Sequence, residues 1–498
     1  MYFQRFYDTP LAQASYIIGC QRTGEAVVVD PIRDVQQYLD AATHEGLRIT
    51  HVTETHIHAD FVSGARELAQ RTDARLLLSR EGGDDWQYAY AEQEGAQLLA
   101  DGDHFHVGNI RLDVLHTPGH TPEHLSFMVT DVPAHAGPWG ILTGDFAFVG
   151  DVGRPDLLER AAGMKGTMEA GARALFRSLE RFRALPDHLQ VWPGHGAGSA
   201  CGKAIGAVAS TTVGYEKLAN WGLTTTDETE FVRFVLEGQP EPPRYFREMK
   251  RINREGPRIL GERRPPARLP DDALDDLLRS GAVVLDTRRA AEFAGCHVPG
   301  TLNIPLDDGF TTWAGWLLPY DREVYLIADD ARMVSKAVRD LATIGLDRVG
   351  GYLGTDALGG WSRSGHALQR IAQATPREVA AMLAHGAVVI DVRGRTEWEA
   401  GRLPGARNVP LGYLAEQMGD LPTDRPIIVQ CQTGRRSAIG ASLLQAHGRT
   451  NVVNMTGGYA GWTAADLPVA CGRASGRADP VVPARSHAPA PAHILPVG

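Results

Sequence analysis

The sequence predicts an α/β protein that consists of an α/β sandwich followed by two small doubly wound α/β domains. Three observations lead to this prediction: short apolar runs that end in His and Asp through residues 1–250, a charged and proline-rich segment after them, and an internal repeat beyond that segment. The chain of 498 residues is also too long for a single hydrophobic core. About three domains are expected for this length.

Apolar runs alternate with turns rich in Gly, Asp and His over the first 250 residues. Each run has the length and composition of a strand, and helical patterns separate some of them, for instance at 34–46 and 64–72. The strand candidates are 26–30, 74–79, 110–117, 125–130, 139–145 and 189–195. Because these strands end where His and Asp cluster, we expect a sandwich in residues 1–250 with a site at its strand ends.

An internal repeat follows the segment 251–270, which we interpret as a linker. Residues 283–306 match residues 388–411 with a constant offset, and each copy continues through a second apolar strand, a helix and a Gly-Gly-aromatic segment. We therefore predict two small α/β domains, at 271–370 and 374–470. The segment 471–498 mixes Pro, Ala, Ser and His without periodicity and is predicted to be a disordered tail.

Composition narrows the classes of function. The formal charge of −10 argues against a nucleic-acid binder, which normally shows a basic face. Neither a secretory signal nor a run of about twenty apolar residues is visible, so no membrane partner is expected. The five cysteines lack paired spacing. A disulfide framework is therefore not expected, and a reducing, cytoplasmic location fits best.

The strongest chemical signal is a set of His and Asp residues on four separate segments. The segments are THIHADF (55–61), TPGH (117–120), TGD (143–145) and PGH (193–195). Imidazole and carboxylate are preferred ligands of first-row divalent metals. Any one of these motifs alone is more typical of a surface turn, but all four in this order predict a metal site.

This order of motifs resembles the metallo-β-lactamase superfamily, specifically its glyoxalase II and persulfide dioxygenase branch. Dinuclear hydrolases of that branch carry a histidine directly after the aspartate, where this chain has Phe61. Because an aromatic ring offers no donor atom, we expect a mononuclear site. The resemblance to persulfide dioxygenases implies that one Fe(II) per chain is held by His56, His120 and Asp145, with zinc as the alternative metal.

The resemblance also implies roles for neighbouring residues. His58, Asp60 and His195 would orient the ligands or mark a vestigial second metal position. Arg154 lies in a segment that resembles the GxGRxD loop of persulfide dioxygenases, where it would bind a carboxylate of a thiol such as glutathione. The alternative is an arginine that ties down its own loop by salt bridges. Cys201, in the Gly-rich segment that follows, is interpreted as a packed thiol.

A second chemical signal is a cysteine between the apolar strand 427–430 and a helical pattern. A thiol at this place meets free backbone N–H groups and the positive end of the helix dipole. Two arginines nearby favour the thiolate, and the same cradle suits a persulfide anion. The residues of this loop are Cys431, Gln432, Thr433, Gly434, Arg435, Arg436 and Ser437.

The CxxGxRS pattern of this loop resembles an active rhodanese, which implies that Cys431 carries the transferred sulfur. A buried structural cysteine is one alternative, and a phosphatase is another because related loops bind phosphate. The short span from Cys431 to Arg436 matches sulfurtransferases better than the longer phosphatase loops. In the first copy the corresponding strand leads to Asp329. That copy is therefore expected to lack sulfur transfer and to be a spacer or a docking surface.

Together these resemblances imply an enzyme that oxidises the persulfide of a small thiol, such as glutathione persulfide, with O2 to sulfite. The rhodanese would produce that persulfide from a sulfane sulfur donor such as thiosulfate, so one chain would carry two steps of sulfide oxidation and detoxification. One alternative is a zinc hydrolase of glyoxalase II type that cleaves a thioester, with the rhodanese modules as a sulfur relay. A non-enzymatic relay scaffold is a third hypothesis, against which the complete triad argues. A homo-oligomer is compatible with the sequence.

Overall fold

The computed structural model describes residues 1–498 except 161–165, 240, 262–264, 473–480 and 483–498. The chain forms two compact units. The first unit comprises Met1–Pro265, Asp307–Tyr320 and Ser335–Asp347, and the second comprises Pro266–Leu306, Asp321–Val334 and Arg348–Gly498. Within the described part of the chain, no helix has both the length and the apolar character needed to cross a membrane.

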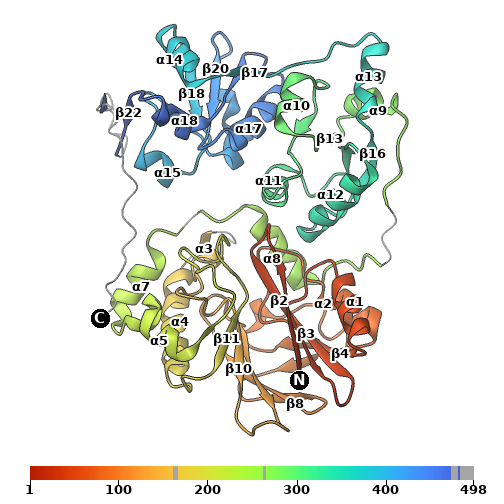
Figure 1. Ribbon diagram of the computed structural model, residues 1–498, viewed down its shortest axis with the longest axis vertical. Coiled ribbons are helices and arrows are strands. Elements are labelled where there is room, and N and C mark those ends of the chain that lie inside the picture. Colours follow the sequence, from red (N-terminus) through yellow and green to blue (C-terminus); the bar gives the residue numbers. More distant parts are fainter. Residues whose placement is uncertain (161–165, 240, 262–264, 473–480, 483–498) are drawn as a thin grey trace. The chain divides into compact units, whose positions relative to one another are not determined.

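The first unit contains an α/β/β/α sandwich built on two six-stranded sheets (Figure 1). The first sheet has the order β1 (Tyr2–Asp8), β2 (Gln13–Cys20), β3 (Glu25–Val29), β4 (Arg48–Thr53), β5 (Arg75–Ser79) and β6 (Gln97–Leu99). The second sheet has the order β12 (Thr211–Thr212), β11 (Gln190–Pro193), β10 (Gly140–Gly144), β9 (Leu125–Asp131), β8 (Ile110–His116) and β7 (His104–Val107). The helices of this region are α1 (Gln36–His44), α2 (Ala65–Thr72), α3 (Leu157–Arg160), α4 (Thr167–Arg183), α5 (Val213–Ala219), α6 (Trp221–Thr224), α7 (Glu228–Leu236) and α8 (Tyr245–Glu255), with a short 3-10 turn at Asp84–Trp86.

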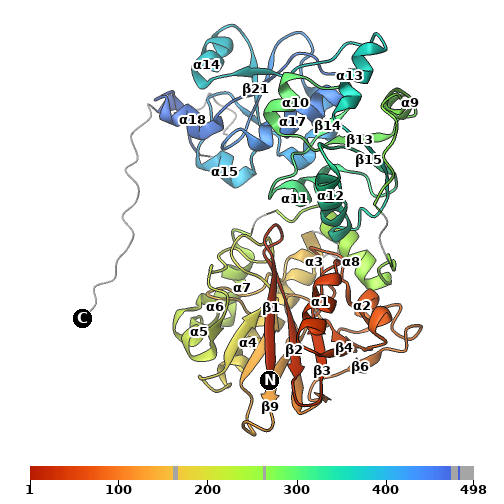
Figure 2. The same cartoon turned by 45° about the vertical axis from the view of Figure 1, so that its right-hand side comes forward.

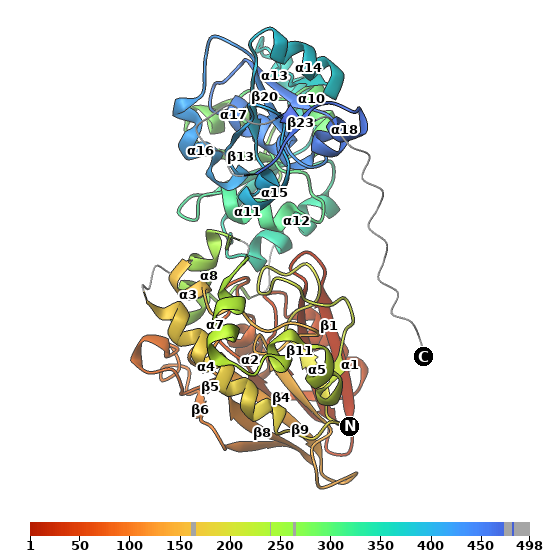
Figure 3. The same cartoon turned by 90° about the vertical axis from the view of Figure 1, so that its left-hand side faces the viewer.

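Three hydrophobic cores hold these layers together. The central core lies between the sheets and joins Val29 of β3 to Phe127 of β9 and Leu142 of β10. One outer core packs α1 and α2 against the first sheet, and the other packs α4 and α7 against the second sheet (Figure 3). Since both faces of the first sheet are covered, β2 is buried along its whole length.

All six strand candidates and both helical patterns of the first 250 residues are confirmed as strands and helices. Some strands of this region were not predicted. Two of them, β1 and β4, lack a purely apolar run because charged or polar residues alternate with apolar ones. In β1 this mixture reflects partial exposure of nearly every residue at the edge of the sheet. The predicted fold class, an α/β sandwich followed by two small doubly wound α/β domains, is also confirmed.

Two all-parallel sheets, one for each copy of the sequence repeat, lie in the second unit (Figure 2). Their strand orders are β14-β13-β15-β16 and β17-β21-β20-β18-β19. The first copy contains α9 (Ala273–Arg279), β13 (Val283–Asp286), α10 (Ala290–Gly295), β14 (Leu302–Asn303), α11 (Phe310–Leu317), β15 (Val324–Ile327), α12 (Ala331–Thr343), β16 (Val349–Leu353) and α13 (Asp356–Arg363). The second contains β17 (Ala372–Ala374), α14 (Pro376–Ala384), β18 (Val388–Asp391), α15 (Arg395–Ala400), β19 (Arg407–Asn408), α16 (Leu414–Gln417) with 3-10 turns at Leu411–Tyr413 and Met418–Asp420, β20 (Ile427–Gln430), α17 (Arg435–Ala446), β21 (Val452–Met455) and α18 (Gly458–Ala464).

Helix α17 connects the two copies. It packs against β20 and β21 of its own copy and also against β14 of the first copy (Figure 2). The Ser442 hydroxyl accepts the backbone N–H of Asn303 at 3.1 Å, and the Gln445 amide donates to the carbonyl of Arg370 at 3.0 Å. Because protein covers several of its faces, the segment 435–446 has no continuous polar stripe.

The domain boundaries drawn from the sequence stay predictions. Helix α8 extends to Glu255, so its last turn lies inside the segment 251–270 that we interpreted as a linker. Part of that segment, 262–264, lies outside the described residues. The predicted disordered tail also lies outside them, apart from residues 471–472 and β23 (Val481–Val482), which pairs with β22 (Val469–Ala470).

Helix α8 anchors the loop that carries the first histidine motif. The buried Asn253 amide donates to the carbonyls of His58 at 2.8 Å and Phe61 at 2.7 Å. Its Oδ1 atom accepts the backbone N–H of Ser63 at 2.9 Å. One amide side chain thus pairs with three backbone groups of this loop, in addition to the loop's bonds to Asp30 and Glu123.

We expect Asn253→Ala to lower the free energy of unfolding by about 3 kcal/mol, since three buried backbone groups lose partners worth about 1 kcal/mol each. Urea unfolding followed by circular dichroism measures this change. Arg251→Ala is the matched control, because Arg251 is an exposed residue of the same helix whose ion pairs among the described residues are with Glu248 and Glu255. Its effect should stay below about 1 kcal/mol. Equal effects of the two substitutions would contradict the anchoring role.

Candidate metal centre and cysteine loop

His56, His120 and Asp145 converge from three different loops. His56 lies beyond the end of β4, His120 lies between β8 and β9, and Asp145 directly follows β10. The Oδ2 atom of Asp145 is 3.9 Å from His56 Nε2 and 3.5 Å from His120 Nε2. All three side chains are buried, and together they form a group that can hold a metal ion.

Hydrogen bonds behind His56 determine which ring nitrogen faces this group. The Thr55 hydroxyl donates to Asp30 Oδ2 at 2.9 Å, so it accepts from His56 Nδ1 at 2.9 Å. The neutral ring then presents a lone pair on Nε2, an atom with no hydrogen-bond partner among the described residues. This is the tautomer that a metal ligand requires.

Protonation also suits metal binding. Burial, together with the neighbouring histidines, holds the pKa of His56 well below its usual range. Burial lowers the pKa of His120 to about 4, against the opposing charge of Asp145. Burial alone would raise the pKa of Asp145, but the nearby His195 outweighs it and holds that pKa well below its usual range. Neutral imidazoles and an ionised carboxylate are the ligand forms that a divalent metal needs.

Asp60, His195 and Cys201 form a second buried group, whose ligand atoms lie within 4.8 Å of one another. His195 Nε2 is 3.2 Å from Asp60 Oδ2 and 3.4 Å from Asp145 Oδ2, so Asp145 contacts both groups. Burial raises the pKa of Cys201 to about 12, against the opposing effect of His195. The interpretation of Cys201 as a packed thiol accounts for its burial but not for these neighbours.

His58 belongs to neither group. Its Nε2 atom donates to Asp30 Oδ1 at 3.1 Å. Burial lowers the pKa of His58, but the charge of Asp30 outweighs it and raises that pKa to about 9. The ring of Phe61 is fully buried, with its centroid 4.4 Å from that of His58. His58 thus contacts the carboxylate of Asp30. The same carboxylate accepts the Thr55 hydroxyl, and that hydroxyl in turn contacts the His56 ring.

Two residues that the sequence analysis did not single out complete these surroundings. The backbone N–H of Asp145 donates to His124 Nε2 at 3.1 Å, and His124 Nδ1 therefore donates to Thr117 Oγ1 at 2.9 Å. Glu123 Oε1 accepts the N–H of Ile57 at 2.8 Å and so links two ligand-bearing loops. In the sequence, both residues lie between the TPGH motif and the strand candidate 125–130, and this position could have indicated a role near the metal site.

The guanidinium of Arg154 is fully buried and paired inside the protein. Its Nε and Nη2 atoms donate to the two carboxylate oxygens of Asp156 at 2.9 and 2.8 Å, and Nη1 donates to the carbonyl of Ala200 at 2.9 Å. These contacts tie the loop after β10 to the segment that carries Cys201. They favour the loop-tethering alternative over a carboxylate-binding role for Arg154.

Cys431 lies at the end of β20, under a tightly folded loop. Its Sγ atom accepts the N–H of Gly434 at 3.1 Å, and Gly434 adopts φ +100°, a value that favours glycine. The carbonyl of Cys431 accepts the N–H of Tyr459 at 2.7 Å, and its closeness to Gly458 leaves no room for a Cβ there. The Ser437 hydroxyl donates to the Gly434 carbonyl at 3.1 Å. The other predicted loop residues lie in the same segment: Gln432, Thr433, Arg435 and Arg436.

Carboxylates pair with the cations around this loop. Arg436 donates to both oxygens of Glu397, at 2.8 and 2.7 Å, so its charge is largely compensated. Arg393, which the sequence analysis did not assign to the site, donates to Asp391 at 2.8 Å and to Gln432 Oε1 at 3.2 Å. The sequence repeat could have indicated this residue, because the equivalent arginine of the first copy, Arg288, forms the same pair with Asp286.

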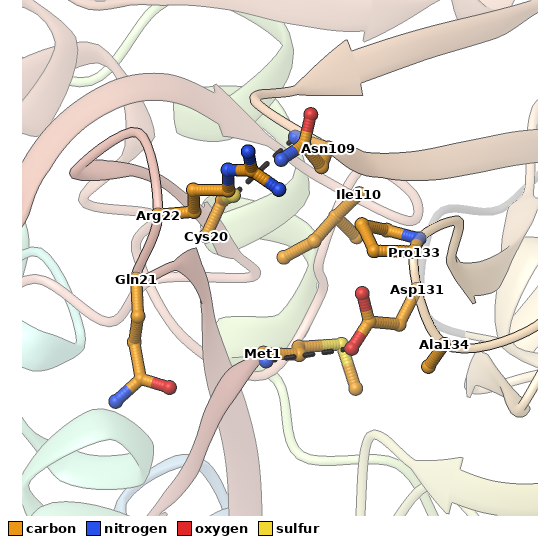
Figure 4. A pocket seen from close by; sticks show the side chains of 9 residues that line it. All are labelled: Met1, Cys20, Gln21, Arg22, Asn109, Ile110, Asp131, Pro133 and Ala134. Atoms are coloured by element: carbon orange, nitrogen blue, oxygen red, sulfur yellow. Dashed lines mark hydrogen bonds and ion pairs between the residues drawn. The ribbon is translucent and has the colours of Figure 1, made fainter.

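A separate pocket of about 360 Å³ lies beside β2 and the β8–β9 hairpin (Figure 4). Its lining includes Cys20, Arg22, Asn109 and Asp131, and none of the metal-ligand candidates. The Cys20 Sγ atom accepts the N–H of Asn109 at 3.3 Å. Burial opposes the Cys20 thiolate, but hydrogen bonds, with Thr23 foremost, outweigh it and lower the pKa. This pocket is independent of the two ligand groups.

Two family models match the chain. The model described as the metallo-β-lactamase superfamily matches residues 8–195, and the model of the rhodanese-like domain matches residues 270–355 and 375–465. The first range contains every candidate metal ligand except Cys201. The second of the two rhodanese-like ranges contains the whole Cys431 loop.

Similar proteins come from several organisms. A metallo-β-lactamase of known structure from Staphylococcus aureus is 43% identical, and the match covers 71% of this chain and 99% of that chain with a TM-score of 0.64. Persulfide dioxygenase ETHE1 of Bos taurus is 28% identical over 237 residues, which are 47% of this chain and 79% of that protein. Hydroxyacylglutathione hydrolase of Nitrosococcus oceani is 33% identical over 184 residues, 36% of this chain and 61% of that protein. The chain spans 53 to 61% of the length of the first curated relatives that it matches.

These comparisons agree with the architecture and with the order of the motifs. The two six-stranded sheets carry the His and Asp motifs at one edge, and each copy of the repeat forms its own parallel sheet. The nearly complete coverage of the Staphylococcus aureus structure includes residues beyond the sandwich. The chain therefore belongs to the metallo-β-lactamase superfamily, and two rhodanese-like domains follow its metallo-β-lactamase domain.

Proposed function

We propose that this protein is a non-haem Fe(II) persulfide dioxygenase fused to a rhodanese sulfurtransferase, and that it acts in sulfide oxidation. The observation that carries the proposal is the buried group of two imidazoles and one carboxylate. Such a set binds one face of Fe(II) and leaves three positions open for further ligands. The similarity to a persulfide dioxygenase and the two rhodanese-like domains support it, and both domain types indicate an enzyme.

In this proposal His56, His120 and Asp145 hold one iron per chain. Several buried atoms have no hydrogen-bond partner among the described residues, and His56 Nε2 and both carboxylate oxygens of Asp145, which belong to this set, fit the role of metal ligands. Fe(II), when bound, supplies a centre at which a persulfide sulfur and O2 meet. Asp30 and Thr55 keep the His56 ring in the required tautomer, and the surrounding burial excludes water.

The proposed net reaction of the first site is balanced: a persulfide RSSH, O2 and H2O give the thiol RSH, sulfite and two protons. The terminal sulfur is oxidised and O2 is reduced, while the third oxygen of sulfite comes from water. A small thiol such as glutathione is the proposed carrier, and a cytoplasmic location is part of the proposal.

The proposed second activity is sulfur transfer at Cys431. Its thiolate attacks the sulfane sulfur of a donor such as thiosulfate, the S–S bond of the donor breaks, and sulfite leaves. The N–H of Gly434, which donates to Cys431 Sγ at 3.1 Å, stabilises the attacking thiolate. A small thiolate then attacks that sulfur, forms RSS⁻ and regenerates Cys431. The product is the substrate proposed for the iron site.

A zinc thioester hydrolase of glyoxalase II type is the second candidate. The similarity to hydroxyacylglutathione hydrolase favours it, as does the position of Asp60 and His195 beside Asp145. Phe61 argues against it, since a dinuclear hydrolase of this branch needs a donor there. Metal identity and oxygen consumption separate the two candidates.

The first test measures oxygen uptake by the iron-loaded protein with glutathione persulfide. We expect one O2 consumed and one sulfite formed per persulfide, and no hydrolysis of a glutathione thioester by the same preparation. Thioester hydrolysis without oxygen uptake would establish the hydrolase instead.

A second prediction concerns Asp145→Ala. We expect the variant to lose its iron during gel filtration, because two imidazoles alone bind Fe(II) weakly. Iron analysis of the purified protein measures this. Asp113→Ala is the control, since Asp113 is a carboxylate of β8 that pairs with Arg111 at the surface. It should keep the wild-type iron content, and iron retention by both variants would contradict the ligand assignment.

A third prediction separates the two activities. Cys431→Ser should abolish sulfur transfer from thiosulfate, because a hydroxyl is not ionised at neutral pH and forms no persulfide. Oxygen uptake with preformed persulfide should be unchanged. Cys296→Ser, which alters the cysteine of the first copy, should retain both activities. Loss of sulfur transfer in the Cys296 variant would show that the first copy takes part in the reaction.

A further inference from the structure

We propose that Thr343, Gly345 and Asp347 of the first rhodanese-like copy position the loop of the first histidine motif, and with it the iron ligand His56. These three residues lie in residues 343–347, which end α12 and form the turn after it; this segment is called the α12 turn below. It belongs to the same compact unit as the metallo-β-lactamase domain. The copy without a cysteine at the position of Cys431 would thus serve the metal site. The role of His56 as a ligand rests on the proposed function.

The first contact holds one peptide unit of the histidine loop, the unit between Phe61 and Val62. The N–H of Val62 donates to the carbonyl of Thr343 at 2.7 Å. The carbonyl of Phe61, on the other side of the same unit, accepts the Asn253 amide at 2.7 Å. Phe61 and Val62 are both fully buried. A buried backbone group needs a partner, so the orientation of this peptide unit depends on the first copy as well as on α8.

The second contact is a buried ion pair. Arg33 Nη2 donates to Asp347 Oδ2 at 3.1 Å, and the two side chains are 1% and 14% exposed. The same Nη2 atom donates to the carbonyl of Arg258 at 2.5 Å. Removal of one partner of a buried ion pair is strongly destabilising, because the other charge stays in the interior without compensation. Asp347 therefore determines where the Arg33 side chain lies.

Arg33 belongs to the turn after β3, and this turn supports the histidine loop at both of its ends. Asp30 of the turn accepts the backbone N–H of Thr55 at 2.6 Å and the Thr55 hydroxyl at 2.9 Å. The carbonyl of Pro31 accepts the N–H of Gly64 at 2.8 Å. A shift of this turn would therefore move the residues on either side of the motif.

The third contact is a close approach that only a glycine allows. Gly345 adopts φ +75°, which favours glycine. A Cβ atom at this position would lie 2.9 Å from Ile252 Cδ1 and 3.2 Å from both Met249 Cε and Val62 Cγ2. Ile252 and Met249 belong to α8, the helix that also carries Asn253. The α12 turn thus packs against the histidine loop and against the helix that anchors this loop.

These contacts act on the backbone on both sides of His56. The ion pair of Asp347 acts through the turn that holds Thr55, and Thr343 acts on Val62 at the other end of the motif. Ligands that are already in place lose little conformational entropy when they bind an ion. We therefore expect a disturbed α12 turn to lower the affinity for the metal.

The first test measures the affinity of the full-length protein for Fe(II) and for Zn²⁺ by competition with a chelating dye. Asp347→Ala should lower both affinities about 10-fold, the low end of what the loss of a partner outside the ligand set costs. Asp321→Ala is the control, because Asp321 is an exposed carboxylate of the same copy that lies 4.0 Å from Arg322. It should bind both ions as the wild type does.

The second test separates a shift of the histidine loop from backbone strain. Gly345→Ala adds a methyl group against Val62, whereas Gly281→Ala adds one in open space at the same φ of +75° in the same copy. We expect lower affinity for both ions in the Gly345 variant only. The ligand-field absorption bands of the Co²⁺-substituted protein report coordination geometry, and they should change in Gly345→Ala but not in Gly281→Ala.

The outcomes are distinct. Wild-type affinities in Asp347→Ala and Gly345→Ala would overturn the proposal, and so would equal losses in the Gly345 and Gly281 variants. If Asp347→Ala does not fold, as judged by circular dichroism, the comparison of Gly345→Ala with Gly281→Ala decides. Lower affinity in the Gly345 variant, together with a wild type that consumes no oxygen with any persulfide, would refute the proposed function and leave the positioning role established.

Discussion

The buried carboxylate of Asp145 is the group on which the chemistry of the first unit depends. A carboxylate removed from water requires cations or hydrogen-bond donors around it. Imidazoles from three other loops lie within 3.9 Å of its Oδ2 atom, and its own backbone N–H is held by His124. These loops meet because β4, β10 and β11 all end at the edge of the sandwich where the metal motifs follow. The cores between and outside the sheets therefore determine whether the ligand set exists at all.

Hydrogen bonds from residues around the metal-ligand candidates hold the ligand-bearing loops in place. Asp30 holds both Thr55 and His58, Glu123 links the loop of His56 to that of His120, and Asn253 of α8 ties down the same loop from outside. Each of these groups is buried and hydrogen-bonded to a backbone atom or to a ligand. Such preorganisation matters for a metal site because ligands that are already in place lose little conformational entropy on binding.

The second unit places a buried cysteine, Cys431, in a short loop directly before a helix. Backbone N–H groups and left-handed glycines shape the Cys431 loop, and Glu397 compensates one of its two arginines. Helix α17 starts in this loop and is covered on its far side by β14 of the first copy. The first copy, which has no cysteine at the position that corresponds to Cys431, thus contributes packing to the helix that follows Cys431.

The sequence by itself determined the fold class, the two copies of the repeat and the segments that carry His, Asp and Cys. The linear sequence suffices for these features, since strand length and the spacing of apolar residues depend on neighbouring residues, and the repeat appears when one segment is compared with another. Only the tertiary structure decided which side chains meet. Cys201 joins Asp60 and His195, Arg154 pairs with Asp156 and the carbonyl of Ala200, and His124 supports Asp145. These contacts join loops that are far apart in the chain, and their distances follow from how the two sheets pack, which no local pattern encodes.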